Sequence, residues 1–311
     1  MFLKTRFTRT DNQSLHDALR PLVAYKPLVD PDISQDDFLN AAFVAKTETV
    51  SALHNSKVLP MILDFKRLGN RGSFLHIKNT STDLEPLATP KSIQESAALS
   101  IAHPMLAGLA MLFNDIAPKR FENTIRFPVN HHAMNEEPWH GHPDYGYTLF
   151  YCQHGDPNAQ TRVLCAETIA KLTFTYYPEG LDALFKPQAF IPQIEPFALI
   201  QKSRKNGYIF ASELNSIKTS LLEHVDGLDL PDMQSCLKYW RDNSDIDDSA
   251  KAALTFMMTI LTYHGAFCDK IMTYERGDIV IFNEKNTARY SQSFQPSDQK
   301  NPRWLQSLSV F

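Results

Sequence analysis

The chain has 311 residues, 43% of them hydrophobic and 21% charged, so it is long enough to bury a large core. Its formal net charge is -4, which leaves no excess of positive charge for a phosphate backbone and excludes nucleic acid as an expected partner. No window approaches the ~18 uninterrupted apolar residues needed to cross a bilayer. The opening residues, MFLKTRFTRTDNQ, lack the apolar run of a secretory signal. We therefore expect a cytoplasmic protein with no membrane partner.

The first third of the chain, about residues 1–120, has a helical pattern. Ser34 followed by Asp37 forms a capping pair, after which apolar residues recur at helical spacing. A second capping pair, Ser92 with Glu95, opens the run SIQESAALSIAHPMLAGLAMLF, which predicts a helix packed into the core. Between them GSFLHIKN alternates apolar and polar residues after a turn signal, and this predicts a strand.

From about residue 124 the pattern changes to short β-type runs separated by Pro, Gly and Asn turns. These runs are TIRFPV, YTLFYC, TRVLCA, AFIPQI, YIFAS and DKIMTYERGDIVIFN. Such spacing is typical of a sandwich or barrel. Residues 213–262 return to helical periodicity. The simplest layout is a single domain over 1–311, mainly β with α, in which helices pack outside a β-core and are inserted between its strands.

The cysteines and several polar residues are expected to be structural. Four cysteines are present, none in a C-x-x-C pair, which favours buried free thiols over disulfides or a zinc site. They are Cys152, Cys165, Cys236 and Cys268. His103 and His154 lie beside Pro104 and Gly155, so we assign both histidines to turns or helix ends. Asp278 is expected to cap the turn into its strand.

The stretch HHAMNEEPWHGHPD, residues 131–144, is the best candidate for a metal site. Alternate residues of an extended segment face the same way, so His140 and His142 can point at one ion. Iron(II) oxygenases bind their metal with two histidines and one carboxylate on one face of an octahedron, leaving the opposite positions open.

The assignment of a metal site to His140 and His142 is strengthened by the C-terminal segment GDIVIFNEKNTARYSQSFQPSDQKNPRWLQSLSVF. Here the chain resembles the clavaminate synthase-like and taurine dioxygenase-like iron(II)/2-oxoglutarate oxygenases. The segments GNRGSFLHIKNTSTDLEPLATP, HPDYGYTLFYCQHGDP and TRVLCA are similar to further family segments, in the family's order. The resemblance implies a double-stranded β-helix, or jelly roll, with flanking and inserted helices. It also implies that Arg303 grips the 2-oxoglutarate carboxylate and that Thr161 helps to seat this cosubstrate.

The metal ligands depart from the family pattern. Fourteen residues before Arg303 stands Arg289, where the family has its distal histidine. A guanidinium offers no lone pair, so it cannot be an ordinary metal ligand. In WHGH, residues 139–142, His142 stands where the family carboxylate belongs. Choosing His132 as the first ligand instead puts Met134 in that place, which is no better.

Three interpretations remain open. A rearranged centre can form from His140, His142 and one acid, for which Asp144, Glu136 and Glu137 are candidates. Iron can have been lost, with Arg289 filling the vacant position and pairing with an acid or an anionic ligand. A third interpretation has another histidine, such as His264 or one of the pair at 131 and 132, complete the site.

The resemblance implies Fe(II) and 2-oxoglutarate as cofactors and an oxidoreductase that hydroxylates, desaturates or otherwise oxidises a small amino-acid-like molecule. In our primary hypothesis His140, His142 and Asp144 bind the metal, Arg303 and Thr161 bind the cosubstrate, and Arg289 acts at the reacting centre. The alternative hypothesis is a metal-free descendant that binds a small ligand or performs non-oxidative chemistry in a biosynthetic pathway. The sequence gives no indication of the oligomeric state.

Overall fold

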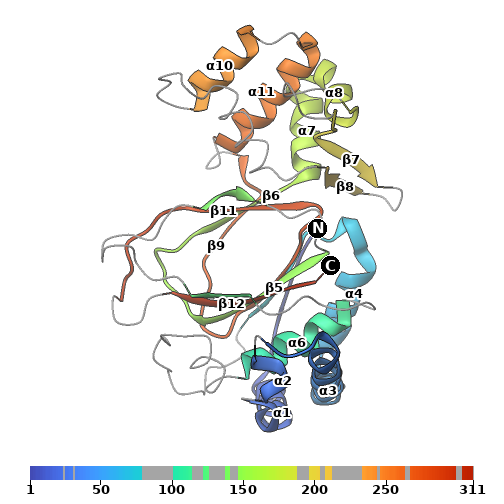
Figure 1. The fold of residues 1–311 in the computed structure, drawn as a ribbon, viewed down its shortest axis with the longest axis vertical. Helices are drawn as coiled ribbons and strands as arrows, with labels where there is room; N and C mark the ends of the chain where they lie inside the picture. The colour runs from blue at the N-terminus through green and yellow to red at the C-terminus, as the bar shows by residue number, and fades with distance from the viewer. Residues whose placement is uncertain are drawn as a thin grey trace.

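The computed structural model describes residues 1–23, 25–30, 32–78, 101–113, 122–125, 137–140, 146–187, 196–203, 207–211, 233–243, 246–262, 267–298 and 303–310. In this part of the chain two β-sheets face each other, with one group of helices below the larger sheet and a second group above the smaller one (Figure 1). The chain therefore forms layers in the order helix, sheet, sheet, helix.

The larger sheet has six described strands in the order β1-β2-β10-β5-β12-β3. These are β1 (Phe2–Arg6), β2 (Phe74–Lys78), β10 (Ile279–Asn283), β5 (Tyr147–His154), β12 (Trp304–Val310) and β3 (Glu122–Ile125). All neighbours are antiparallel except β1 and β2, which run parallel. The strand β1 was not predicted from the sequence. It forms the edge of the sheet beside β2, which lies about 70 residues later in the sequence.

The smaller sheet has four described strands in the order β4-β11-β6-β9, all antiparallel. These are β4 (Glu137–His140), β11 (Thr287–Ser291), β6 (Thr161–Cys165) and β9 (Lys270–Met272). Strands that follow one another along the chain, such as β5 and β6 or β10 and β11, lie in opposite sheets. This alternation produces the double-stranded β-helix and leaves an interior between the sheets.

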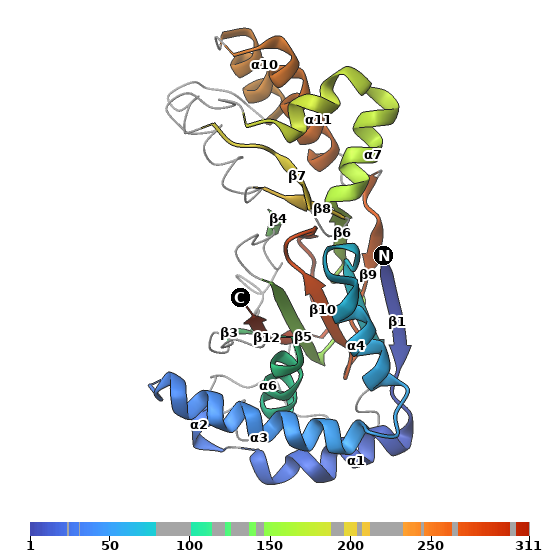
Figure 2. The same cartoon turned by 90° about the vertical axis from the view of Figure 1, so that its right-hand side faces the viewer.

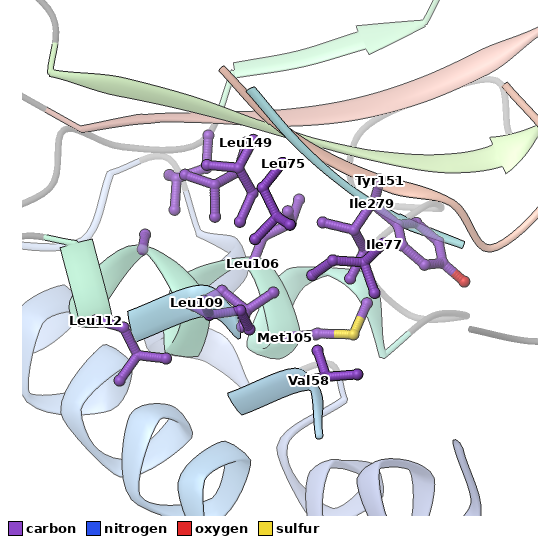
Figure 3. Close-up of a cluster of buried hydrophobic side chains, with 14 of the residues drawn as sticks. Val58, Leu75, Ile77, Met105, Leu106, Leu109, Leu112, Leu149, Tyr151 and Ile279 are labelled. Carbon is purple, nitrogen blue, oxygen red and sulfur yellow. The ribbon is translucent and has the colours of Figure 1, made fainter. Parts of the chain in front are cut away.

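Alternation of side chains along the strands divides the interior from the helical layer. On β10, Ile279 and Ile281 pack against helices, whereas Val280 and Phe282 belong to a cluster between the sheets. Figure 3 shows Ile279 above a helix from which Leu106 and Leu109 point toward the sheet, and Ile281 belongs to the same cluster. Both faces of the central strands are therefore buried, which explains why their sequences read as continuous apolar runs.

The N-terminal helices cover the outer face of the larger sheet. They are α1 (Arg9–Leu19), α2 (Lys26–Val29), α3 (Gln35–Leu53), α4 (Val58–Leu68) and α6 (Ala102–Phe113). The Ser34 cap is confirmed, because its side chain accepts a hydrogen bond from the Asp37 backbone N–H. The apolar run that ends at Phe113 forms the buried helix α6. Its expected start at Ser92 lies outside the described residues.

A second group of helices and a two-stranded sheet lie between β6 and β9 in the chain. The helices are α7 (Ala166–Tyr176), α8 (Leu181–Phe185), α10 (Met233–Asn243) and α11 (Asp248–Thr262), and the strands are β7 (Ile200–Ser203) and β8 (Gly207–Phe210). They share a core that contains the fully buried Trp240. We expected helices at 213–262, but the structure already has helix from Ala166 onward. TRVLCA ends as a strand at Cys165 and its last residue begins α7.

Two further strands were expected, at residues 124–129 and 189–194. TIRFPV was expected as one strand over 124–129, and the described strand β3 covers 122–125. AFIPQI, residues 189–194, lies outside the described residues. No helix in the described part of the chain is long and apolar enough to span a membrane.

Candidate functional site

Arg289 lies in the interior between the two sheets. It is the central residue of β11, where it faces His140 of β4 and Val163 of β6 in the strand register. Its side chain is 6% exposed, and its guanidinium carbon lies 4.8 Å and 4.9 Å from the ring centroids of Phe150 and Phe282. The rings of one sheet thus pack against a cation from the other, in the geometry of a cation–π contact.

Glu284 supplies the counter-charge of Arg289. Oε1 of Glu284 lies 2.8 Å from Nη2 of Arg289, and the glutamate side chain is fully buried. Glu284 stands in the turn between β10 and β11, which Asn283 closes by accepting a hydrogen bond from the Lys285 backbone N–H through its side chain. This turn connects the larger sheet to the smaller one. Glu284, just after β10, therefore faces the interior beside Arg289 of β11.

Arg303 lies just before β12 and is 4% exposed. Its Nη2 is 3.5 Å from Oγ1 of Thr161, the first residue of β6, and its guanidinium carbon is 5.2 Å from the ring centroid of Tyr274. Within the described part of the chain its Nε has no hydrogen-bond partner and the guanidinium forms no ion pair. A buried cation with a free Nε donor and no carboxylate in ion-pair contact is suited to an anionic ligand, although the buried Asp156 carboxylate also acts on its charge from further away.

Burial is the main influence on the pKa values of Arg303 and Tyr274. Burial lowers the pKa of Arg303 from its usual value, although Tyr274 and Cys152 act in the opposite direction, and a guanidinium stays protonated in proteins. Burial also raises the pKa of Tyr274, opposed by Arg303 and by a hydrogen bond with Thr161. The Tyr274 phenol is therefore neutral at physiological pH. Among Arg303, Tyr274 and Thr161, only the Arg303 guanidinium is charged.

The two arginines belong to one interior. Ser291 faces Thr161 in the register of β11 and β6, two residues beyond Arg289, so all three side chains share a face of the smaller sheet. Tyr274 is close enough to both arginines for each to lower its pKa against the effect of burial. Arg289, Thr161 and Arg303 were selected from the sequence as site residues, and the structure brings them together.

The candidate metal ligands are only partly within the described residues. The backbone of His140 ends β4 and lies opposite Arg289, but its side chain is outside the described part, as are His142 and Asp144 entirely. Among the side chains that the structure does describe, no group of three His, Cys, Asp or Glu is arranged to hold a metal ion. Position 289 does not fit an iron ligand, since its side chain has no lone pair and is already paired with Glu284.

Other polar residues have structural roles. Asp278 accepts a hydrogen bond from the Glu275 backbone N–H, as expected of a cap, and it also lies 2.9 Å from Nε2 of His76. His103 is the second residue of α6, and burial lowers its pKa to about 4. His154 ends β5 and stacks on Trp304. Cys152, Cys165 and Cys268 are free thiols, as expected; the side chain of Cys236 is not among those described.

The sequence analysis missed Glu284 and Tyr274. The signal for Glu284 was the string NEKN between two apolar runs, which is typical of a tight turn and places residues on either side of it next to each other. No comparable signal marks Tyr274, because an aromatic residue at a strand end has the same appearance whether it faces a core or a ligand.

No family model matches the sequence, and no curated protein is significantly similar to it. Solved structures are similar in fold. Asparagine oxygenase (AsnO) superposes with a TM-score of 0.63 at 13% identity, covering 99% of this chain and 92% of that one. The non-haem iron oxygenase OrfP, in complex with Fe and alpha-ketoglutaric acid, gives 0.64 at 13% identity, covering 100% and 94%.

The match extends over the whole chain in both cases, so the jelly roll and its helical additions are all shared. At such low identity the similarity establishes the fold and not the activity. The oxygenase fold that the resemblance implied is thereby confirmed. This chain has the fold of the non-haem iron, 2-oxoglutarate-dependent oxygenases.

Proposed function

We propose that the protein is an oxygenase-like oxidoreductase that binds 2-oxoglutarate through Arg303 and Thr161 and acts on a small amino-acid-like molecule, with an atypical metal site. The observation that carries this proposal is the buried Arg303 guanidinium, which has no ion-pair partner among the described residues. A carboxylate is the ligand whose two oxygens match a guanidinium in a paired, charge-assisted contact.

The residues of this chain would act on the ligand in distinct ways. Arg303 would hold a terminal carboxylate, and the Thr161 hydroxyl, 3.5 Å from it, would donate to the same group. Tyr274, neutral and fully buried, would close one side of the pocket against water. The low dielectric of this interior strengthens each of these contacts. Iron and 2-oxoglutarate, when bound, would generate the oxidant from dioxygen.

The solved structures support the choice of ligand and substrate class. Asparagine oxygenase is described in complex with Fe(II), 2S,3S-3-hydroxyasparagine and succinate, and OrfP in complex with L-homoarginine. By analogy of fold, a dicarboxylate and an amino acid are the molecules to test here. His140, His142 and Asp144 stay the candidate metal ligands of this proposal. All three come from one segment, since position 289 provides none.

The test is anaerobic titration calorimetry with 2-oxoglutarate, in the presence and absence of Fe(II). We expect saturable binding by the wild-type chain and loss of at least tenfold in affinity in Arg303→Met. The matched control is Arg162→Met on the same strand as Thr161, where the guanidinium contacts Gln292 at the exposed side of the sheet. Equal affinities in wild type and Arg303→Met, with both folded by circular dichroism, would refute the proposal.

A second candidate function is a metal-free protein that retains the pocket for ligand binding or non-oxidative chemistry. The buried ion pair of Arg289 with Glu284 favours it, because an ion-paired cation stands where the resemblance places a metal ligand. Elemental analysis of protein purified without chelators separates the two. Stoichiometric iron supports the oxygenase, whereas ligand binding without any metal supports the metal-free alternative.

A further inference from the structure

A cavity lies at one edge of the jelly roll, where the two sheets differ in width. The strands β1 and β2 extend the larger sheet beyond β9, which ends the smaller sheet, and the two edges lie alongside each other (Figure 2). The inner face of β1 and β2 and the segment 270–273 enclose a cavity of about 290 Å³. Arg289, Thr161 and Arg303 do not line it, so it is separate from the candidate active site.

The wall formed by the larger sheet is flat and aromatic. Phe2 and Phe74 face each other in the parallel register of β1 and β2, and their rings stack with centroids 4.8 Å apart. Phe74 is buried and Phe2 is 40% exposed, so the aromatic surface that the cavity offers is mainly the Phe2 ring, backed by Phe74. Ile271, on the opposite rim, is 45% exposed. Such a surface is suited to covering by a planar apolar group.

The rim of the cavity is positively charged. The described residues that line it include three lysines and one histidine and no acidic side chain. Lys4 and Lys270 are exposed, and neither forms an ion pair with a described residue. Lys78 does have a partner, Glu275 at 2.9 Å, but this carboxylate is 70% exposed and its effect is screened by water. The cavity therefore presents uncompensated positive charge around an apolar wall.

A fixed imidazole lies at the back of the cavity. His76 faces Lys4 across the β1–β2 register, and its side chain is only 10% exposed. Its Nε2 is held 2.9 Å from Oδ2 of the fully buried Asp278, which leaves Nδ1 as the remaining polar atom of the ring. A carboxylate behind an imidazole fixes the orientation of the ring.

We propose that this cavity binds a small aromatic anion, that is, a planar ring carrying a phosphate or carboxylate group. The ring would lie on the stacked pair Phe2 and Phe74, and the anionic group would meet Lys4, Lys270 and His76. This site goes beyond the proposed function, since it uses none of the residues assigned to the cosubstrate or the metal.

The test is a fluorescence titration of the full chain with 1-anilinonaphthalene-8-sulfonate, an aromatic anion that becomes emissive when bound. We expect one saturable site in the wild type and at least a tenfold rise in Kd in the double variant Lys4→Glu/Lys270→Glu. The double variant Lys186→Glu/Lys238→Glu has the same net charge and alters exposed lysines on other elements, so its Kd should match the wild type.

Displacement of the probe identifies the ligand class. Adenosine monophosphate and benzoate carry the two anionic groups on planar rings, and displacement by either one supports the proposal and names the group. Inorganic phosphate, which has charge but no ring, should displace the probe at least tenfold less well. The proposal is overturned if both double variants bind the probe equally, if neither aromatic anion displaces it, or if inorganic phosphate competes as well as they do.

Discussion

Arg289 on β11 lies directly opposite His140 on β4 in the antiparallel register of the smaller sheet. The position across from the best candidate metal ligand thus carries a permanent cation, and Glu284 neutralises it from the turn that joins the sheets. Breaking one partner of a buried ion pair costs much more than replacing both, because it leaves a charge without compensation in a low dielectric.

Removal of the buried counter-charge should destabilise the protein strongly. We expect Glu284→Gln to lower the free energy of unfolding by about 3 to 5 kcal/mol, measured by urea denaturation, because the guanidinium of Arg289 loses its carboxylate. The double variant Glu284→Gln/Arg289→Met should recover much of this loss. Additive losses in the double variant would show that the two side chains are not energetically coupled.

An exposed ion pair provides the comparison. Lys171 and Glu167 lie 2.8 Å apart on the surface of α7, with side chains 71% and 46% exposed. We expect Lys171→Met to change the free energy of unfolding by less than about 1 kcal/mol, because water screens both charges. A similar loss at both pairs would mean that burial does not govern the cost.

Thr161→Val tests the hydroxyl beside Arg303 without changing the volume of the side chain. A hydrogen bond from a hydroxyl to a charged group contributes about 1.5 to 3 kcal/mol. We therefore expect the Kd for 2-oxoglutarate, measured by calorimetry, to rise by roughly tenfold or more. Thr161→Ser keeps the hydroxyl and should bind within a few-fold of the wild type. If Val and Ser variants bind alike, the hydroxyl does not contact the ligand.

Gly155 permits a close approach of two backbone segments next to the site. A Cβ added at this position would lie 2.0 Å from the backbone carbonyl oxygen of Tyr274, which cannot move aside as a flexible side chain can. We expect Gly155→Ala to lower the free energy of unfolding by about 1 to 3 kcal/mol, since overpacking displaces the backbone. It should also weaken ligand binding at Arg303, because Tyr274 packs against that guanidinium.

The control for this variant is Asn158→Ala in the same turn. The Asn158 side chain donates to the Gln295 carbonyl oxygen at an exposed position, so its loss should cost less than about 1 kcal/mol. Unchanged stability in Gly155→Ala would contradict the close packing of the turn against Tyr274.

His103 should make stability depend on pH. Burial lowers its pKa to about 4, below the ordinary value of 6.5, so the unfolded chain takes up a proton first as the pH falls. The stability is complete above pH 6.5 and declines toward pH 4, where the loss reaches about 3 kcal/mol. His103→Leu should lack this component when unfolding is measured across the same range. Direct titration of the imidazole by NMR near pH 6.5 would contradict the prediction.

The order of strands along the chain could be predicted from the sequence to a large extent. YTLFYC and GDIVIFN read as buried strands because both faces of the central strands contact apolar neighbours. The Ser34 cap located the start of α3, since capping is a local interaction between residues three apart. β1 was missed because five residues of mixed polarity become a strand only when β2 offers an edge.

What the sequence alone determined was therefore local or carried by ordered motifs: helix starts, buried strands and the jelly roll. It also predicted that Thr161, Arg289 and Arg303 belong to one site, and the structure places these three side chains in the same interior. The tertiary structure decided which charges meet. Glu284 neutralises Arg289, whereas no described carboxylate forms an ion pair with Arg303. The physical reason is that side-chain pairing depends on distances set by strand register and sheet packing. These bring together residues that are far apart in the sequence, so their spacing along the chain does not predict the contact.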